Sequence, residues 1–95
     1  MRISHEQIDI LKKEIIAVLP DAIVYLFGSR ADDNKKGGDI DIMILSNRKI
    51  SWKEKAMIKW HYFGKFGEQK LDIISSTFKE ETPFKQIVLQ EGIRL

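Results

Sequence analysis

The sequence predicts an α/β fold in the broad sense (α+β): a small mixed β-sheet flanked by helices, in a single domain over residues 1–95. Three short apolar runs have the composition of buried strands, and three longer segments repeat apolar residues at helical spacing. About eleven residues join the first two strand-like runs, which is too few for a crossover helix. We therefore expect these two strands to be antiparallel neighbours.

The first helix is predicted to start at Ser4, because Ser4 and Gln7 form a capping-box pattern. Apolar residues follow at helical spacing, and Pro20-Asp21 ends the segment. The stripe that this helix is expected to bury consists of Ile8, Leu11, Ile15, Ile16 and Leu19.

Strands are predicted over residues 22–27, 39–45 and 70–75. Gly28 breaks the first strand, and a polar loop over residues 30–38 leads to the second, with room for one helical turn at its start. The alternation of side chains in the second strand places its two acidic residues on one face and its isoleucines on the other.

The second helix is predicted to run from the N-cap Ser51 to about Phe63, with Gly64 and Gly67 at its end. Its large apolar residues are expected to form its core face, although one tryptophan is left open as part of a protein interface. These residues are Trp52, Met57, Trp60 and Phe63.

The last helix is predicted to begin at Thr82-Pro83, a cap followed by a proline, and to stop at Gly92. We expect it to bury Phe84, Ile87 and Val88. The predicted order is therefore helix, strand, loop, strand, helix, strand, helix.

The composition limits the class of protein. With 43% hydrophobic and 32% charged residues, it is typical of a soluble globular chain, and a net charge of +2 is too small to indicate nucleic-acid binding. There is no cysteine, which excludes disulfides and thiolate metal sites. No apolar run approaches the length of a membrane span, and the first residues do not form the apolar core of a signal peptide. We expect a cytoplasmic protein without membrane contact and without direct nucleic-acid binding.

Two acidic residues, Asp39 and Asp41, lie in the second strand-like run. At positions i and i+2 of a strand, their side chains share a face and lie roughly 6.5 Å apart along the chain. Such carboxylates repel each other and are costly to desolvate unless a cation lies between them, and Mg²⁺ is commonly shared with substrate phosphates. A solvated edge strand is the alternative, but Met43 and Leu45 continue this face as apolar residues. The pattern favours a metal–nucleotide site at a strand end.

Gly28-Ser29 precedes this pair at the end of the first strand. A glycine lets the backbone approach a phosphate closely, and the Ser29 hydroxyl and the amides of the turn can donate to it. Arg30 can add a charge-assisted hydrogen bond. Lys35 and Lys36 are weaker phosphate-binding candidates because solvated loop lysines are common, and a simple tight turn is the alternative for Gly28-Ser29.

Asp72 supplies a third carboxylate, on the opposite face of its strand from Leu71 and Ile73. A charge inside an apolar strand is expensive unless it reaches a shared site. A third acid suits a site that holds two metal ions, and it could also act as a general base toward an attacking hydroxyl. The alternative is a strand-end acid that is neutralised by Lys70 or solvated by water.

Three segments together resemble the polymerase-beta-type nucleotidyltransferase superfamily, namely Gly28-Ser29-Arg30-Ala31, Gly38-Asp39-Ile40-Asp41-Ile42 and Leu71-Asp72-Ile73. The size and the ending Gln90-Glu91-Gly92-Ile93 resemble its minimal nucleotidyltransferase (MNT) branch. The resemblance implies the palm-like fold of polymerase beta. It also implies that Asp39, Asp41 and Asp72 bind two Mg²⁺ ions and that Gly28 and Ser29 hold ATP or another nucleoside triphosphate. Gly38 departs from the pattern, because many members carry serine there.

The resemblance further implies a partner. Minimal members lack a helical substrate domain and commonly pair with an all-helical HEPN protein as antitoxin and toxin, and some transfer AMP from ATP to a tyrosine of that partner. The leading hypothesis is therefore Mg²⁺-dependent nucleotidyl transfer, with AMP as the transferred group, to a partner's hydroxyl. A non-catalytic antitoxin that acts by binding is one alternative, and transfer to a small molecule or RNA is another. A homodimer is left open, because a second copy could supply a missing wall of the site.

Overall fold

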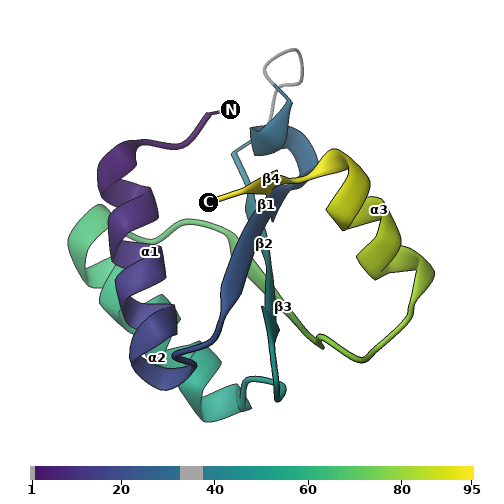
Figure 1. Ribbon diagram of the computed structural model, residues 1–95. Helices are drawn as coiled ribbons and strands as arrows, with labels where there is room; N and C mark the ends of the chain where they lie inside the picture. Colours follow the sequence, from purple (N-terminus) through teal and green to yellow (C-terminus); the bar gives the residue numbers. More distant parts are fainter. Residues whose placement is uncertain (1, 33–37) are drawn as a thin grey trace.

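The computed structural model describes residues 2–32 and 38–95 of the chain, which form three α-helices, one 3₁₀ helix and a four-stranded sheet (Figure 1). The predicted fold class is confirmed. The elements follow in the order α1 (His5–Val18), β1 (Ile23–Phe27), η1 (Gly28–Ala31), β2 (Ile40–Ser46), α2 (Trp52–Phe66), β3 (Leu71–Thr77), α3 (Pro83–Glu91) and β4 (Ile93–Arg94). The two-residue strand β4 was not expected from the sequence.

The sheet has the strand order β3-β2-β1-β4 and is mixed. β1 runs antiparallel to β2, as predicted, and also to β4, whereas β2 and β3 are parallel and joined through α2. In this register Asp41 lies opposite Phe27 on one side and Asp72 on the other. The end of β1 and the starts of β2 and β3 therefore meet at one edge of the sheet.

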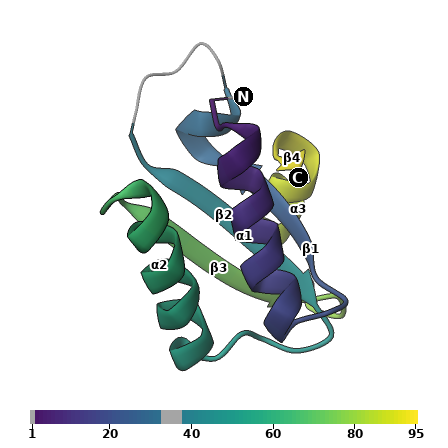
Figure 2. The same ribbon diagram turned by 90° about the vertical axis from the view of Figure 1, so that its left-hand side faces the viewer.

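Helices cover both faces of the sheet. α1 and α2 lie side by side on one face, and α3 lies on the other (Figures 1 and 2). Ile40, Ile42 and Ile44 of β2 are fully buried toward α1 and α2, whereas Met43 and Leu45 pack with Val88 of α3. Because side chains alternate along a strand, the carboxylate of Asp41 lies on the α3 side, in line with Met43.

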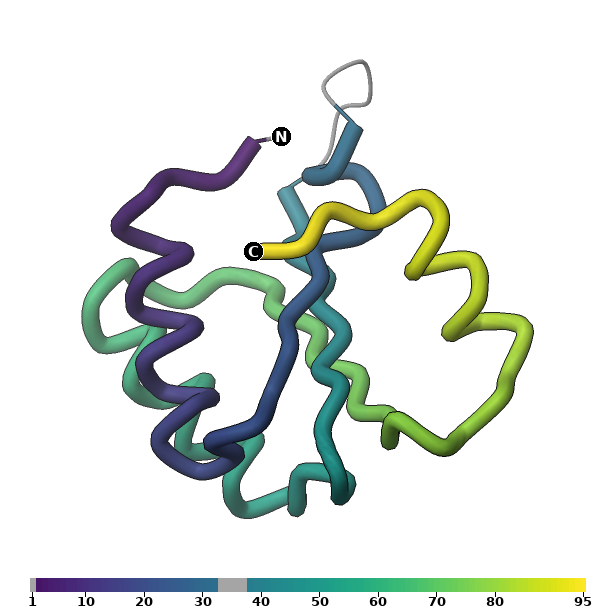
Figure 3. Tube along the Cα trace, in the orientation of Figure 1, coloured from purple at the N-terminus to yellow at the C-terminus, as the bar shows by residue number. Residues whose placement is uncertain are grey.

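The N-terminal end of the described chain lies near η1, and the C-terminal end lies beside β1 (Figure 3). The amide of Arg2 donates to the carbonyl of Arg30 at 2.8 Å, and Ile93 in β4 pairs with Leu26 in β1. The N-terminal segment thus supports the turn that follows β1, and the C-terminal strand supports β1 itself. No helix among the described residues is long and apolar enough to cross a membrane.

Helix α2 presents a different face to the core from the predicted one. Ile58 and Tyr62 are buried, but Trp52, Met57 and Trp60 are 75%, 58% and 76% exposed. Both sets have helical spacing, so hydrophobicity alone could not choose between them. The hydroxyl of Tyr62 accepts a hydrogen bond at 2.9 Å from Gln7 in α1, which gives the buried phenol a partner.

Phe63 was predicted to lie on the core face of this helix, and it packs partly buried against the same core, so this prediction is confirmed. The helix continues to Phe66, beyond the predicted end, because Gly64 remains helical. Gly67 ends it with a positive φ of 83°, a conformation that suits glycine.

Two smaller predictions about buried residues are also wrong. Ile16 in α1 is 41% exposed, because Leu11 and Ile15 already fill the space above the sheet. In α3, Phe84 and Ile87 are 41% and 53% exposed, while Lys85 is buried with Val88.

Lys85 is only 5% exposed, because its ammonium group is saturated by backbone carbonyls. Its Nζ donates to the carbonyls of Thr77, Phe78 and Glu80 at 3.2, 2.9 and 2.7 Å. A buried cation is tolerated when all of its donors are satisfied in this way. Lys85 thus ties the loop after β3 to the first turn of α3.

Candidate active site

The candidate residues meet where three strands come together. Asp41 and Asp72 are paired positions on β2 and β3, and Phe27, which precedes Gly28, pairs with Asp41 on the other side. Asp39 directly precedes β2, and Ser29 lies in the 3₁₀ turn that follows β1. The structure therefore brings Gly28, Ser29, Asp41 and Asp72 to one edge of the sheet, from segments far apart in the sequence.

Gly28 is in direct contact with the carboxylate of Asp41. Its φ is +75°, and a Cβ atom placed on it would lie 2.5 Å from Oδ2 of Asp41. Any other residue would be strained by its backbone conformation and would also collide with the acid. The backbone of the turn can therefore lie directly against the carboxylate.

Asp41 is crowded by other acids. Burial raises the pKa of Asp41, and Asp72, which lies within hydrogen-bonding reach, raises it further, as does the charge of Asp39. Lys70 acts in the opposite direction, but its effect is smaller. The pair Asp41–Asp72 is thus a concentration of negative charge that a proton or a metal cation would relieve.

Asp39 has a different partner from the other two acids. Its Oδ2 lies 3.4 Å from Nζ of Lys70, and both side chains are about half exposed or more. Among the described residues, no three acidic, histidine or cysteine side chains are gathered closely enough to hold a metal ion. Of the three predicted carboxylates, the structure brings Asp41 and Asp72 into contact and leaves Asp39 beside them in an ion pair.

The donor set nevertheless fits Mg²⁺. Carboxylate oxygens are the ligands this ion prefers, and it usually needs only one or two of them together with water and substrate phosphates. Burial, and then the neighbouring acids Asp72 and Asp39, raise the pKa of Asp41, and the opposing charge of Lys70 has a smaller effect. Because the Asp39–Lys70 pair is exposed to solvent, its contribution is small and Asp39 can exchange Lys70 for another cation.

Arg30, predicted to contact phosphate, is engaged with the backbone. Its Nη1 donates to the carbonyl of Arg2 at 2.7 Å and its Nη2 to the carbonyl of Gly38 at 3.0 Å. Arg2 in turn donates to the carbonyl of Ser29 at 3.1 Å. Arg30 therefore holds the N-terminal segment and the residue before Asp39 on either side of the turn.

This positioning role could not be read from the sequence, because nothing in it links Arg30 to Arg2, 28 residues away. The two loop lysines that were weaker candidates, Lys35 and Lys36, lie outside the described residues.

Comparison with known proteins identifies the family. The family model described as Polymerase beta, Nucleotidyltransferase matches residues 6–95. The chain belongs to this family. The match spans all three segments that carry the resemblance in sequence, from Gly28-Ser29 to Asp72. A search of curated proteins found no match.

Solved structures share the fold of this nucleotidyltransferase-family chain. A mutant of the toxin–antitoxin complex MntA–HpeT has a TM-score of 0.71 at 20% identity, over 99% of this chain and 72% of that one. A tri-AMPylated Shewanella oneidensis HEPN toxin in complex with MNT antitoxin has a TM-score of 0.58 at 21% identity, over 93% of this chain and 70% of that one. The crystal structure of a putative nucleotidyltransferase from Sulfolobus solfataricus has a TM-score of 0.52 at 23% identity, over 93% of this chain and 80% of that one. At these identities the likeness concerns the fold.

Proposed function

We propose that this chain is a Mg²⁺-dependent nucleotidyltransferase that transfers AMP from ATP to a hydroxyl group of a HEPN-type partner protein, as the antitoxin of a toxin–antitoxin pair. The observation that carries the proposal is the contact of the Asp41 carboxylate with Gly28 on one side and with Asp72 on the other. This arrangement combines a cation-binding acid pair with a backbone turn that can approach a phosphate.

Each residue has a role in this proposal. Asp41 and Asp72, joined by Asp39, would hold Mg²⁺, which would supply positive charge against the triphosphate. The hydroxyl of Ser29 and the amides of its turn donate to phosphate oxygens. Asp72, on the edge strand of the sheet, would accept the proton of the attacking hydroxyl. The oxygen of that hydroxyl bonds to the α-phosphorus of ATP, the bond from this phosphorus to the bridging oxygen of the β-phosphate breaks, and pyrophosphate leaves. Arg30 keeps the turn and Asp39 in position through its backbone contacts.

The proposed partner and transferred group rest on the structural neighbours. The Shewanella oneidensis complex contains a HEPN toxin that carries AMP groups together with an MNT antitoxin. The MntA–HpeT complex, at a TM-score of 0.71, is also a toxin–antitoxin pair. A nucleotidyltransferase-family chain with the same fold is a candidate for the same role toward a partner protein.

The test is transfer of label from α-³²P ATP to the partner. The purified chain is incubated with labelled ATP, Mg²⁺ and the protein encoded beside it, and the products are separated on a gel. We expect label on the partner, and its loss with EDTA and with Asp41→Asn. Asp9→Asn is the matched control, because it makes the same change at an exposed position of α1 and should leave transfer intact.

A non-catalytic antitoxin is the second candidate, and the Asp39–Lys70 ion pair is the observation that favours it. Asp39 is already neutralised by a lysine, and among the described residues it is not gathered with the other acids into a metal-binding cluster. In the same experiment this candidate predicts a stable complex with the partner, no transferred label, and neutralisation of the partner that survives Asp41→Asn.

A further inference from the structure

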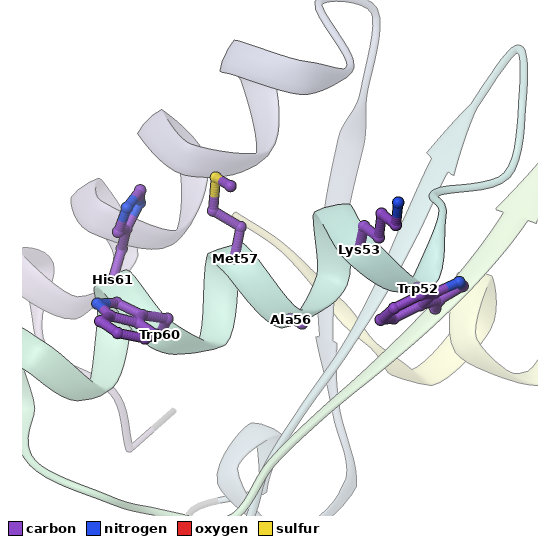
Figure 4. Close-up of a pocket in the computed structure, with 6 residues that line it drawn as sticks. All are labelled: Trp52, Lys53, Ala56, Met57, Trp60 and His61. Carbon is purple, nitrogen blue, oxygen red and sulfur yellow. The ribbon is translucent and has the colours of Figure 1, made fainter.

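The outer face of α2 carries an unusual set of exposed residues. Two adjacent rows run along the helix, and both are visible in Figure 4. Figure 4 labels Trp52, Ala56 and Trp60 of the first row, which has a spacing of four, and Lys53, Met57 and His61 of the second, on the side toward α1. The helical spacing continues the first row to Gly64. We refer to these seven residues as the α2 outer face.

Exposure of this kind is costly and calls for a partner. Both tryptophans are about three-quarters exposed, while the core of the protein is complete without them. Between them, above Ala56, lies an open hollow of about 520 Å³. Large contiguous apolar patches on a soluble protein typically mark interaction sites. Tryptophan in particular is enriched at the centres of interfaces.

We propose that the α2 outer face is a homodimer interface in which α2 packs antiparallel against α2 of a second copy. A two-fold axis perpendicular to the helices relates the two copies. Each row then lies against the same row of the second copy, which runs in the opposite direction. Such an interface has to be complementary to itself, and the residues of the first row meet that condition.

The first row alternates large and small side chains about its midpoint, which lies at Ile58. Because a row at a spacing of four is inclined to the helix axis, the two helices have to cross at about 50° for the rows to align. In that arrangement Trp60 of one copy faces Ala56 of the other, and Trp52 faces Gly64. Gly64 is exposed with no atom within 4 Å of the position a Cβ would take, so there is space for an indole ring. Each tryptophan of one copy therefore lies opposite a small residue in the row of the other.

The second row adds charge complementarity. The midpoint of the second row is Met57, one residue along the helix from the midpoint of the first row. Met57 of one copy therefore faces Met57 of the other, and Lys53 faces His61. Nδ1 of His61 lies 2.7 Å from Oε2 of Glu14 in α1. The ammonium group of Lys53 thus approaches the His61–Glu14 pair of the second copy at each end of the interface, where its charge is opposite to that of the Glu14 carboxylate.

The available area predicts a weak dimer. Trp52, Trp60 and Met57 together would bury on the order of 500 Å² per copy, hence about 1,000 Å² in total, which is the lower limit for a specific interface. The dissociation constant is therefore expected in the micromolar range, at about 1–100 μM.

This inference goes beyond the proposed transfer function and does not depend on it. The carboxylate of Asp41 lies on the α3 side of the sheet, whereas α2 lies on the other side (Figures 1 and 2). The dimer would leave both candidate sites open. Failure of one proposal therefore leaves the other standing.

Dilution of the purified chain is the first test. Trp52 and Trp60 are the two tryptophans of the sequence, so intrinsic fluorescence reports on this face directly. From about 300 μM to 1 μM we expect the emission maximum to shift to longer wavelength as the indoles become solvated. Sedimentation velocity should follow the same transition from dimer to monomer.

A swap of large and small residues tests the pairing itself. Ala56→Trp should raise the dissociation constant at least about tenfold, because it sets an added indole ring against Trp60 of the second copy. The double variant Ala56→Trp with Trp60→Ala exchanges large and small and should restore the affinity of the original chain to within about threefold. Ile87→Ala on α3, also an exposed apolar position, is the control and should leave dimerisation unchanged.

Three results would overturn the proposal. The first is a monomer at every concentration, whether or not another protein binds this face. The second is a dimer that Ala56→Trp leaves intact, since the interface would then lie elsewhere. The third is a single variant that dissociates the dimer while the swapped double variant fails to restore it, with circular dichroism showing that both variants are folded.

Discussion

Gly28 and Asp41 are so close that a Cβ atom on Gly28 would lie 2.5 Å from Oδ2 of Asp41. The contact joins the end of β1 to the neighbouring strand at the point where the antiparallel register pairs Phe27 with Asp41. It explains why the turn after β1 begins with glycine, and it couples the shape of the turn to the position of the acid.

The substitution Gly28→Ala is expected to lower the rate of nucleotidyl transfer at least about a hundredfold, because a misplaced catalytic group has a large effect on rate. It should also destabilise the fold by about 1–2 kcal/mol, since alanine is strained at a φ of +75°. Gly38→Ala is the matched control, because a Cβ at Gly38 meets nothing within 4 Å. Retention of full activity by Gly28→Ala would contradict the role of this contact.

Asp41→Asn is expected to stabilise the protein at neutral pH in the absence of metal while removing activity. The folded state raises the pKa of Asp41, so it holds the proton more tightly than the unfolded chain does. The free energy of unfolding therefore falls as the pH rises from the pKa of Asp41 in the unfolded chain through its pKa in the folded state. Above the folded-state pKa, the full destabilisation by the ionised carboxylate is present. Because the group is largely solvated, the gain from asparagine is up to about 1 kcal/mol.

Thermal unfolding at pH 4 and pH 7 measures this effect. The melting temperature of Asp41→Asn should exceed that of the original chain by a few degrees at pH 7, and the difference should shrink at pH 4, because the raised pKa of Asp41 makes the folded state take up its proton more readily as the pH falls. A difference that is larger at pH 4 than at pH 7 would show that Asp41 is stabilised as a carboxylate and not strained by its neighbours.

Lys70→Gln is expected to tighten Mg²⁺ binding. Lys70 pairs with Asp39 at 3.4 Å and places a positive charge beside the acid pair, where it competes with a metal cation. At the high effective dielectric of an exposed site, its removal should lower the dissociation constant for Mg²⁺ about threefold, as measured by calorimetric titration. Lys79→Gln removes a charge from an exposed loop position and should leave the constant unchanged. Weaker binding by Lys70→Gln would count against competition.

Lys85→Ala is expected to lower the free energy of unfolding by about 2–4 kcal/mol in urea denaturation. The substitution removes a buried aliphatic chain and the ammonium donor of the carbonyls of Phe78 and Glu80, whereas the carbonyl of Thr77 keeps the amide of Glu80 as a donor. Lys85→Met keeps most of the aliphatic part of the side chain, so its loss in the free energy of unfolding should be smaller. The difference between the two variants measures the contribution of packing, and the loss that remains in Lys85→Met measures that of the hydrogen bonds. Lys79→Ala, at an exposed position, is the control, and a loss within about 0.5 kcal/mol of that control would contradict the account.

Much of the fold was predictable from the sequence, because local signals agreed with tertiary structure. The N-caps Ser4, Ser51 and Thr82 start the three helices as expected, and the short link after Gly28 allows only an antiparallel pair. Once the strands are placed, the meeting of Asp41 and Asp72 follows from parallel pairing across α2.

The remaining features depend on contacts between distant segments. The choice between Ile58 and Trp60 as the inward residue of α2 is made by the sheet and by α1, and the helical pattern suits both. A lysine such as Lys85 is ordinarily a surface residue, and only the loop carbonyls above it make its burial favourable. The ion pair of Asp39 with Lys70 likewise arises when the start of β2 meets the start of β3.

The most direct test of the central claim, that the acid pair beside Gly28 forms a metal-dependent nucleotide site, is the melting temperature of the purified chain with ATP in the presence and absence of Mg²⁺. A ligand that binds only the folded state raises the melting temperature. We predict a rise with ATP and Mg²⁺ together that EDTA abolishes and that Asp41→Asn does not show. A rise of the same size without Mg²⁺, or in Asp41→Asn, would contradict the claim.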